Sequence, residues 1–167
     1  LPVSITHYYN SCDSDKDEFG MGYGWRTSLH QTLHKVLYNG EVEFVYTDGD
    51  GTEHFFKKNE DDQKKYSDQS GLSLTLEVGD ENITITDKGD NVMTFPLVSE
   101  TPTEDVPETA KVLIQKIQDA VGNEVTVTAV ADAPLKIASV TDGANRVTTL
   151  HYTCLLYTSD AADERSS

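Results

Sequence analysis

A short turn motif recurs four times in the sequence, and it constrains the fold more than any other feature. In each copy an apolar and a polar residue precede an aspartate, a turn containing Gly, Asn or Asp follows, and a run of apolar residues and threonines comes next. The four aspartates are Asp48, Asp87, Asp119 and Asp142. Aspartate starts a turn by accepting a hydrogen bond from the backbone two residues onward, while Gly and Asn tolerate positive φ. Tight hairpins need such residues. The motif therefore predicts four β-hairpins.

The segments beside these turns alternate apolar and polar residues, as half-buried strands do. Examples are residues 72–78, 83–86 and 125–128. Isolated hairpins are marginally stable in water, so these units are expected to extend a common sheet. The predicted fold is all-β: consecutive antiparallel hairpins forming a curled, twisted sheet, with at most a short helix.

Two segments fit a helix as well as a strand. Residues 25–38 place apolar side chains at helical spacing, yet Leu29, Leu33 and Leu37 also share one face of a strand. Residues 103–117 are ambiguous in the same way. We expect a strand pair in the first segment. In the second we expect a loop, with at most one helical turn, that leads into a strand.

Charge and cysteine content exclude several classes of protein. The formal net charge of −16 argues against nucleic acid and anionic membranes as partners. No apolar run approaches the roughly 20 residues of a membrane-spanning helix.

Residues 154–164 resemble the translation of a sequencing adapter, so residues 154–167 are expected to be a non-native tail and residues 1–153 the protein itself. With Cys154 set aside, Cys12 stands alone, and no internal disulfide is expected.

Several blocks resemble the start of a bacterial Rhs or YD-repeat array. They are residues 8–11, the Gly-Tyr-Gly-Trp-Arg block within residues 20–26, and the hairpin of residues 46–56. Residues 137–152 are similar to one YD unit, in which Asn145 stands where the family usually has glycine. The residues expected to shape this array are Trp25, Asp48, Asp87, Asp119, Gly122, Asp142, Arg146 and Tyr152.

The resemblance implies a β-sheet spiral that forms a hollow shell in a very large secreted or cell-surface bacterial protein, often wall-associated in Gram-positive bacteria. Such a shell typically encloses or displays a variable C-terminal segment, often a polymorphic toxin used against competitors. The chain would be the first, non-catalytic part of the shell, without a cofactor. Its partners would be the remaining YD repeats and the enclosed C-terminal domain, with cell wall or surface glycans as a further candidate.

Candidate sites for metal binding and catalysis have simpler interpretations. Asp48 and Asp50 alternate with glycines as in a calcium loop, but the EF-hand's Gly and Glu are missing. We interpret the segment as a hairpin turn with solvated acids and predict no metal site. His30 and His34 share a face, but zinc needs three or four convergent ligands, so the histidines are expected to be solvent-facing or hydrogen-bonded. No Gly-x-Ser-x-Gly elbow is present, and no enzyme activity is expected.

Aromatic residues crowd the first third of the chain and admit two interpretations. They could form a sugar-stacking platform, which would make the chain a surface adhesin or carbohydrate-binding module. We favour the interpretation that they fill the core. Trp25 in particular is expected to be buried between strands, so that Trp25→Ala would cost roughly 3–5 kcal/mol and unfold the chain. The aromatic residues are Tyr8, Tyr9, Tyr23, Trp25, Tyr38, Phe44, Tyr46, Phe55 and Phe56.

Overall fold

The computed structural model describes residues 5–152, whose regular secondary structure is almost entirely β-strand. They contain fourteen strands and one short 3-10 helix, η1 (Ser11–Asp13), and no α-helix. The strands are β1 (His7–Tyr9), β2 (Trp25–Thr27), β3 (Thr32–Tyr38), β4 (Glu41–Thr47), β5 (Glu53–Lys58), β6 (Lys65–Asp68), β7 (Thr75–Val78), β8 (Asn82–Thr86), β9 (Val92–Pro96), β10 (Val112–Leu113), β11 (Lys116–Gln118), β12 (Glu124–Val130), β13 (Ala133–Thr141) and β14 (Val147–Thr149). The predicted all-β class is confirmed. The proposed tail, residues 154–167, lies outside the described residues.

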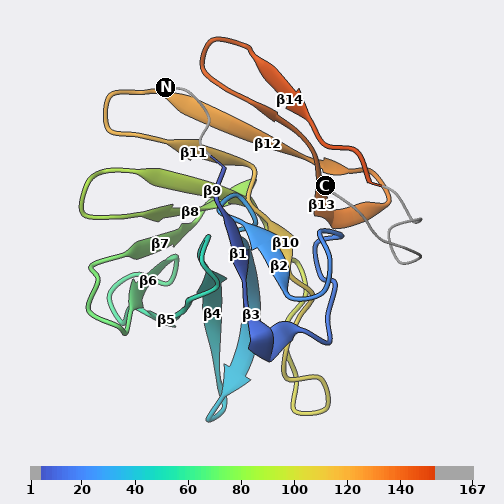
Figure 1. Ribbon diagram of the computed structural model, residues 1–167. Helices are drawn as coiled ribbons and strands as arrows, with labels where there is room; N and C mark the ends of the chain where they lie inside the picture. The colour runs from blue at the N-terminus through green and yellow to red at the C-terminus, as the bar shows by residue number, and fades with distance from the viewer. Residues whose placement is uncertain (1–4, 153–167) are drawn as a thin grey trace.

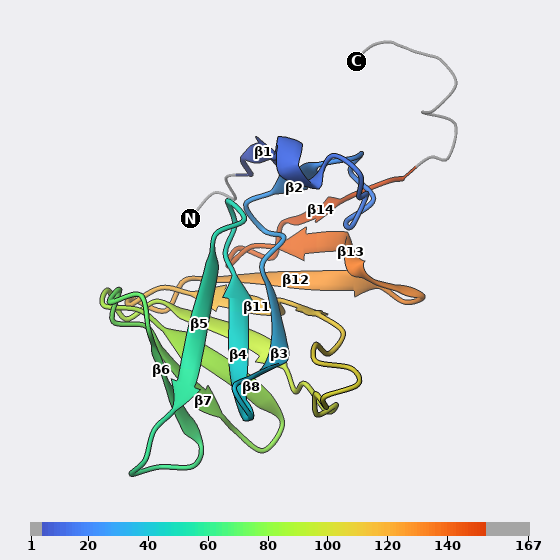
Figure 2. The same cartoon turned by 90° about the horizontal axis from the view of Figure 1, so that it is seen from below.

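Twelve of the strands form one antiparallel sheet in the order β10-β3-β4-β5-β6-β7-β8-β9-β11-β12-β13-β14. From β3 to β9, neighbours in the sheet are also neighbours in sequence, so each pair is a hairpin. The sheet is strongly curled (Figure 1). Strands β1 and β2 form a separate two-stranded sheet, which lies on the same side of the molecule as β13 and β14 (Figure 2).

Residues 107–118 close the curl of the sheet. The first part of this segment runs antiparallel along the edge of β3, where Glu108 bridges Val36 and β10 continues the pairing. The second part, β11, is inserted between β9 and β12. Between the two parts, the backbone N–H of Ile114 donates to the carbonyl of Gln31 over 2.9 Å. One segment is therefore hydrogen-bonded both to β3 and to β9, and it joins the two ends of the β3–β9 series.

The core lies on the inner face of the curled sheet. Ile83 on β8 lies opposite Phe95 on β9, and aromatic and β-branched pairs of this kind stabilise neighbouring strands against each other. The Phe44 ring on β4 packs edge-on against Tyr66 on β6, across the intervening β5, with centroids 4.8 Å apart. The fully buried apolar side chains are Leu33, Phe44, Val45, Phe56, Leu76, Ile83, Ile85, Phe95, Ile114, Ile137 and Val140.

The two segments that also fitted a helix contain none. Residues 25–38 form β2 and β3, as expected for extended chain, although these strands belong to different sheets and do not pair with each other. Residues 103–111 form no regular strand or helix, and they lead into β10 and then β11. Among the described residues, no helix is long and apolar enough to cross a membrane.

The predicted burial of Trp25 is wrong, because its side chain is 43% exposed. Trp25 lies opposite Tyr9 on the outward face of the β1–β2 sheet, whereas the inward face carries Arg26, which is buried. Alternation places Trp25 on the face opposite Arg26, and Thr27 on the same face as Trp25 is buried, so this face is open to solvent only toward Trp25. Three of the other aromatic residues, Phe44, Tyr46 and Phe56, are in the core as expected. Four are exposed, contrary to expectation: Tyr9, Tyr23, Tyr38 and Phe55.

Candidate functional site

The four motif aspartates each begin a hairpin turn, and the four turns have the same backbone geometry. In each, the aspartate N–H donates to the carbonyl of the residue four positions on, and the aspartate carbonyl accepts from the N–H three positions on. That third residue has a positive φ in every copy, between 60° and 94°. The residues with positive φ are Gly51, Asp90, Gly122 and Asn145. This conformation favours Gly, Asn and Asp, which explains the composition of the motif.

The aspartate side chain holds each turn from within. Oδ1 of Asp142 accepts from the backbone N–H groups of Ala144 and Arg146 at 2.9 and 3.0 Å. Its Oδ2 accepts from Nε of Arg146 at 2.7 Å. In two other turns the residue four positions on is an asparagine whose Nδ2 binds the same oxygen, at 3.0 and 2.9 Å: Asn91 for Asp87 and Asn123 for Asp119.

These donors favour the ionised carboxylate. The hydrogen bond from the Asn123 side chain is the main cause that lowers the pKa of Asp119. For Asp142, the backbone N–H of Arg146 is the main cause that lowers the pKa.

The turn at Asp48 differs in its side-chain partners. Oδ2 of Asp48 lies 2.8 Å from Nε2 of His54, and Oδ1 of Asp50 accepts from the hydroxyl of Thr52 at 2.7 Å. Burial raises the pKa of Asp48, and the hydrogen bond with Asp50 raises it further. The same hydrogen bond, together with those from Thr52, lowers the pKa of Asp50 to about 2. The candidate calcium ligands are thus engaged within the turn. In the part of the chain that is described, no three His, Cys, Asp or Glu residues are grouped to hold a metal.

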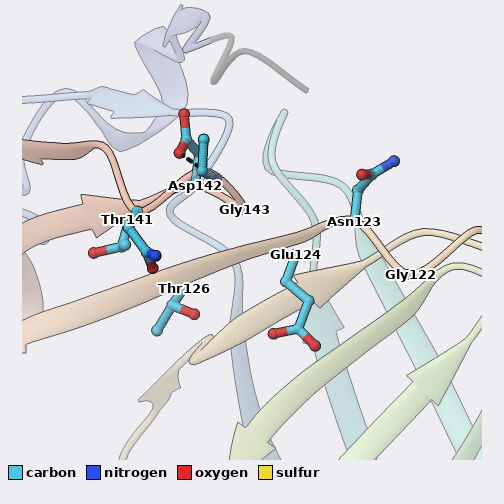
Figure 3. Close-up of a pocket in the computed structure, with 9 residues that line it drawn as sticks. Gly122, Asn123, Glu124, Thr126, Thr141, Asp142 and Gly143 are labelled. Atoms are coloured by element: carbon cyan, nitrogen blue, oxygen red, sulfur yellow. Dashed lines mark hydrogen bonds between the residues drawn. The ribbon is translucent and has the colours of Figure 1, made fainter.

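A polar hollow of about 490 Å³ lies between the turns that begin at Asp119 and Asp142 (Figure 3). Side chains of Glu124, Thr126 and Thr141 line it together with the backbone of both turns. The lining supplies hydroxyl, carboxylate and backbone groups that can form hydrogen bonds. The hollow is the space left where two neighbouring hairpin turns stand side by side.

Tyr152 fastens the last described residues to β13. Its hydroxyl accepts from the N–H of Ile137 at 3.1 Å and donates to the carbonyl of the same residue at 2.8 Å. Nζ of Lys136 lies 5.4 Å from the centre of the tyrosine ring. A Cβ on Gly20, whose φ is +73°, would lie 2.7 Å from Cε of Lys136. This contact brings the N-terminal part of the chain against the last hairpin.

Among the described residues, strand β14 is an edge of the large sheet, and all of its residues are exposed. The N–H of Leu150 donates to the carbonyl of Ala138 on β13, and the carbonyl of Arg146 accepts from the N–H of Asp142, which directly follows β13. Backbone groups alternate in direction along an antiparallel strand. The N–H and C=O groups of Val147 and Thr149 therefore point away from β13, toward the open side of the sheet.

Three of the histidines are buried and have polar partners, which agrees with the hydrogen-bonded alternative of the prediction. His30, His34 and His54 are 0%, 3% and 5% exposed. Nδ1 of His30 binds Thr27 (2.9 Å to the backbone N), and Nε2 of His34 lies 3.3 Å from Glu108. His54 binds the turn at Asp48, as described above.

A fifth turn of related design escaped the sequence interpretation. Oδ1 of Asp68 accepts from the N–H of Ser70 at 3.0 Å, and Gly71 has a φ of 81°. The signal was present, because the three-residue spacing from Asp68 to Gly71 equals that from Asp48 to Gly51.

Comparison with known proteins adds one finding. Residues 1–56 match a family model, DUF6531, which is described as a domain of unknown function. The matched residues contain β1 to β4, most of β5 and the Asp48 turn. No curated protein matches the chain. The N-terminal third of this chain is thus similar to the DUF6531 family.

Proposed function

We propose that the chain is a non-catalytic structural segment, the start of the β-shell of a large secreted or cell-surface bacterial protein of the Rhs/YD-repeat kind. The observation that supports this proposal most is the inequality of the two sheet edges. Residues 107–113 occupy the edge of β3, whereas β14 presents the backbone groups of Val147 and Thr149 to the open side. In the described part of the chain, the short segment 107–113 forms one edge of the sheet and the exposed strand β14 forms the other, so a further strand can be added next to β14.

The uniform turn design supports the same proposal. Each hairpin carries its own turn-forming aspartate and needs no contact with distant residues to set its geometry. Identical local units can be added one after another, as in other repeat proteins whose units contact only their neighbours.

The proposed partners are the remaining YD repeats of the same polypeptide and a C-terminal domain, such as a polymorphic toxin, enclosed by them. The inner face of the described sheet is filled by its own side chains, which form one continuous hydrophobic cluster. In the proposed protein, the space for an enclosed domain would therefore lie under later repeats.

Hydrogen exchange tests the proposal. In the intact secreted polypeptide, the amides of Val147 and Thr149 are expected to be protected, because a following strand pairs with β14. In a chain that ends at residue 152, the same two amides should exchange freely, while the amide of Leu150, which donates to Ala138 over 2.9 Å, stays protected in both. Free exchange of Val147 and Thr149 in the intact polypeptide would overturn the proposal.

One observation favours a second candidate function, a surface adhesin or glycan-binding module. Tyr9 and Trp25 are 54% and 43% exposed, and their ring centres lie 5.2 Å apart at an angle of 45°. Gly24 permits this arrangement, since a Cβ there would lie 2.9 Å from the Tyr9 ring. Exposed aromatic faces stack on sugars, and Tyr and Trp combine an apolar ring with a polar group.

A glycan array distinguishes the two functions. If the chain is a glycan-binding module, Trp25→Ala should abolish the glycan-binding signal. Tyr38→Ala, which changes an exposed tyrosine on β3, should leave the glycan-binding signal intact. The absence of any signal for the wild-type chain would remove this second candidate.

A further inference from the structure

The described residues 5–30 form a small unit, here called the N-terminal block, that rests on one end of the large sheet (Figure 2). Contacts with side chains and backbone of the sheet hold it there. Nζ of Lys111 lies 2.6 Å from Oε2 of Glu18. Gly49 packs closely on the block, since a Cβ at this position would lie 2.5 Å from the carbonyl oxygen of Ser28. Of the strands that the structure describes, β1 and β2 of the block pair only with each other, so separation of the block would break no strand pairing of the twelve-stranded sheet, although it would remove Leu29 from the core cluster.

His30 lies where the block joins β3, and its imidazole is fully buried. Its ring packs on Phe19 with centroids 4.5 Å apart. The guanidinium of Arg26 lies 4.8 Å from the centre of the same Phe19 ring, and its Nη2 donates to the carbonyl of His30. Nη2 also donates to the carbonyl of Asp48 at 3.2 Å, which links the block to the turn after β4.

The hydrogen bonds of His30 fix its protonation state. The backbone N–H of Thr27 donates to Nδ1 at 2.9 Å, so Nδ1 is an acceptor. The Thr27 hydroxyl accepts from the N–H of Leu29 at 3.2 Å and lies 2.8 Å from the same Nδ1. The ring proton of neutral His30 is thus on Nε2, by inference from these partners. Nε2 is buried and has no hydrogen-bond partner among the described residues.

A second proton on His30 is incompatible with this arrangement. An Nδ1–H would point at the N–H of Thr27, and the positive charge would be buried without an acceptor for Nε2. The charged and titratable groups around the ring oppose it as well. Arg26 on β2 and His7 on β1 both act against the cation, and the Asp48 contact reaches Arg26 through a backbone carbonyl rather than a carboxylate.

We propose that His30 is an acid-sensitive latch, whose protonation releases the N-terminal block from the sheet while the twelve-stranded sheet stays folded. The consequence is a pH-dependent exposure of the end of the sheet that the block covers. Neither the shell role nor glycan binding is required for this behaviour.

The direction of the effect follows from linkage. Burial, then Arg26 and His7, lower the pKa of His30 from 6.5 to about 4 in the closed block. The open block binds the proton more readily, so the stability of the closed form is complete above about pH 6.5 and declines as the pH falls toward about 4. Over that window the ratio of closed to open block should fall on the order of a hundredfold.

Urea titrations can separate the block from the sheet. Trp25 is the single tryptophan and lies in the block, so its fluorescence reports the block, while far-UV circular dichroism reports the sheet. Between about pH 7 and about pH 4.5, the urea midpoint of the fluorescence signal should fall more than that of the dichroism signal. In His30→Asn the amide oxygen can accept from Thr27 but cannot be protonated, so this extra fall should be lost. The matched control is His151→Asn, an exposed histidine outside the block, which should keep the extra fall.

A direct measurement covers the case in which His30→Asn does not fold. In the wild-type chain, the ring signals of His30 in nuclear magnetic resonance should titrate only together with opening of the block. The proposal is overturned if His30 titrates near its ordinary pKa with the block closed, if the two urea midpoints fall together, or if His30→Asn keeps the full extra fall.

Discussion

Nε of Arg146 donates to Oδ2 of Asp142 at 2.7 Å, across a turn whose backbone the same carboxylate already holds. The carboxylate is buried, whereas the arginine side chain is 66% exposed. One acidic side chain therefore accepts three hydrogen bonds, from two backbone N–H groups and one guanidinium. The position four residues after each turn-forming aspartate supplies the side-chain donor in three of the four motif turns.

Asp142→Ala should loosen the β13–β14 hairpin, because it removes the acceptor for all three donors. The exchange of the Leu150 amide should become faster by about tenfold or more, since buried donors left without an acceptor are costly. Arg146→Ala removes only the guanidinium and should have a smaller effect. Hydrogen exchange of the Leu150 amide, measured for both variants under the same conditions, shows which substitution has the larger effect. An Arg146→Ala effect as large as that of Asp142→Ala would contradict the assigned role of the carboxylate.

Gly122→Ala should destabilise the chain by about 1–2 kcal/mol through backbone strain alone. Gly122 has a φ of 92°, and nothing lies within 4 Å of an added Cβ. The matched control is Gly143→Ala in the neighbouring turn, where φ is not positive and the nearest atom, the Glu124 carbonyl oxygen, would lie at 3.6 Å. This control should be neutral within about 0.5 kcal/mol or slightly stabilising. Urea unfolding at neutral pH measures both. Equal losses would show that crowding rather than φ sets the requirement for glycine.

Local chemistry explains what the sequence could predict. Each motif turn depends on an aspartate and on one residue with positive φ three positions later, and both can be recognised within five consecutive residues. The preference of turns for residues with positive φ also explains why the predicted start of one strand was wrong. Alternation suggested a strand from Leu72, but β7 begins at Thr75, because Gly71 and Ser73 both have positive φ and keep the chain in the turn.

Features that depend on contacts between distant parts of the chain could not be predicted from the sequence. Residues 107–118 close the curl by pairing with β3, some 75 positions earlier in the chain (Lys35 N–H to Thr109 Oγ1, 3.0 Å), and no local pattern encodes that pairing. The burial of His30 and the exposure of Trp25 have the same origin. Both lie near β2, and only the position of the β1–β2 sheet on the molecule decides which of them faces the interior.

The titration of the turn carboxylates should differ between turns. Asp119 and Asp142, with lowered pKa values, should stay ionised below the ordinary range, so they stabilise their hairpins above about pH 4 and lose this contribution as the pH falls through the folded pKa. Asp48, whose pKa is raised mainly by burial, should take up a proton above that range, so its contribution to stability improves on acidification. Carbon-13 resonance titrations of the carboxyl groups check this order. Asp48 titrating below Asp119 would contradict it.

Phe56→Ala should cost about 3–5 kcal/mol in the free energy of unfolding, because the ring is fully buried between Phe44 and the core. Its neighbour Phe55, on the opposite face of β5, is 42% exposed. Phe55→Ala should therefore cost less than about 1 kcal/mol. The two variants share the residue type, the strand and the substitution, and they differ only in the face of β5 on which the phenylalanine lies. Urea unfolding of the two variants measures the difference, and similar losses would mean that the outer face of β5 is also covered.

Trp25→Ala should leave the chain folded, whereas the loss of a buried Trp25 would be expected to unfold it. The indole is partly exposed and contacts chiefly Tyr9 across the β1–β2 sheet, so its removal should cost roughly 0.5–1.5 kcal/mol, the range of a single aromatic pair. Tyr9→Ala should have a similar effect, and the double variant should lose little more than either single one, because both changes remove the same contact. Thermal unfolding of the wild-type chain, the two single variants and the double variant, followed by circular dichroism, gives the four stabilities of this double-mutant cycle. A Trp25→Ala chain that fails to fold would mean that other residues cover the indole, and strictly additive losses would mean that the two rings do not interact.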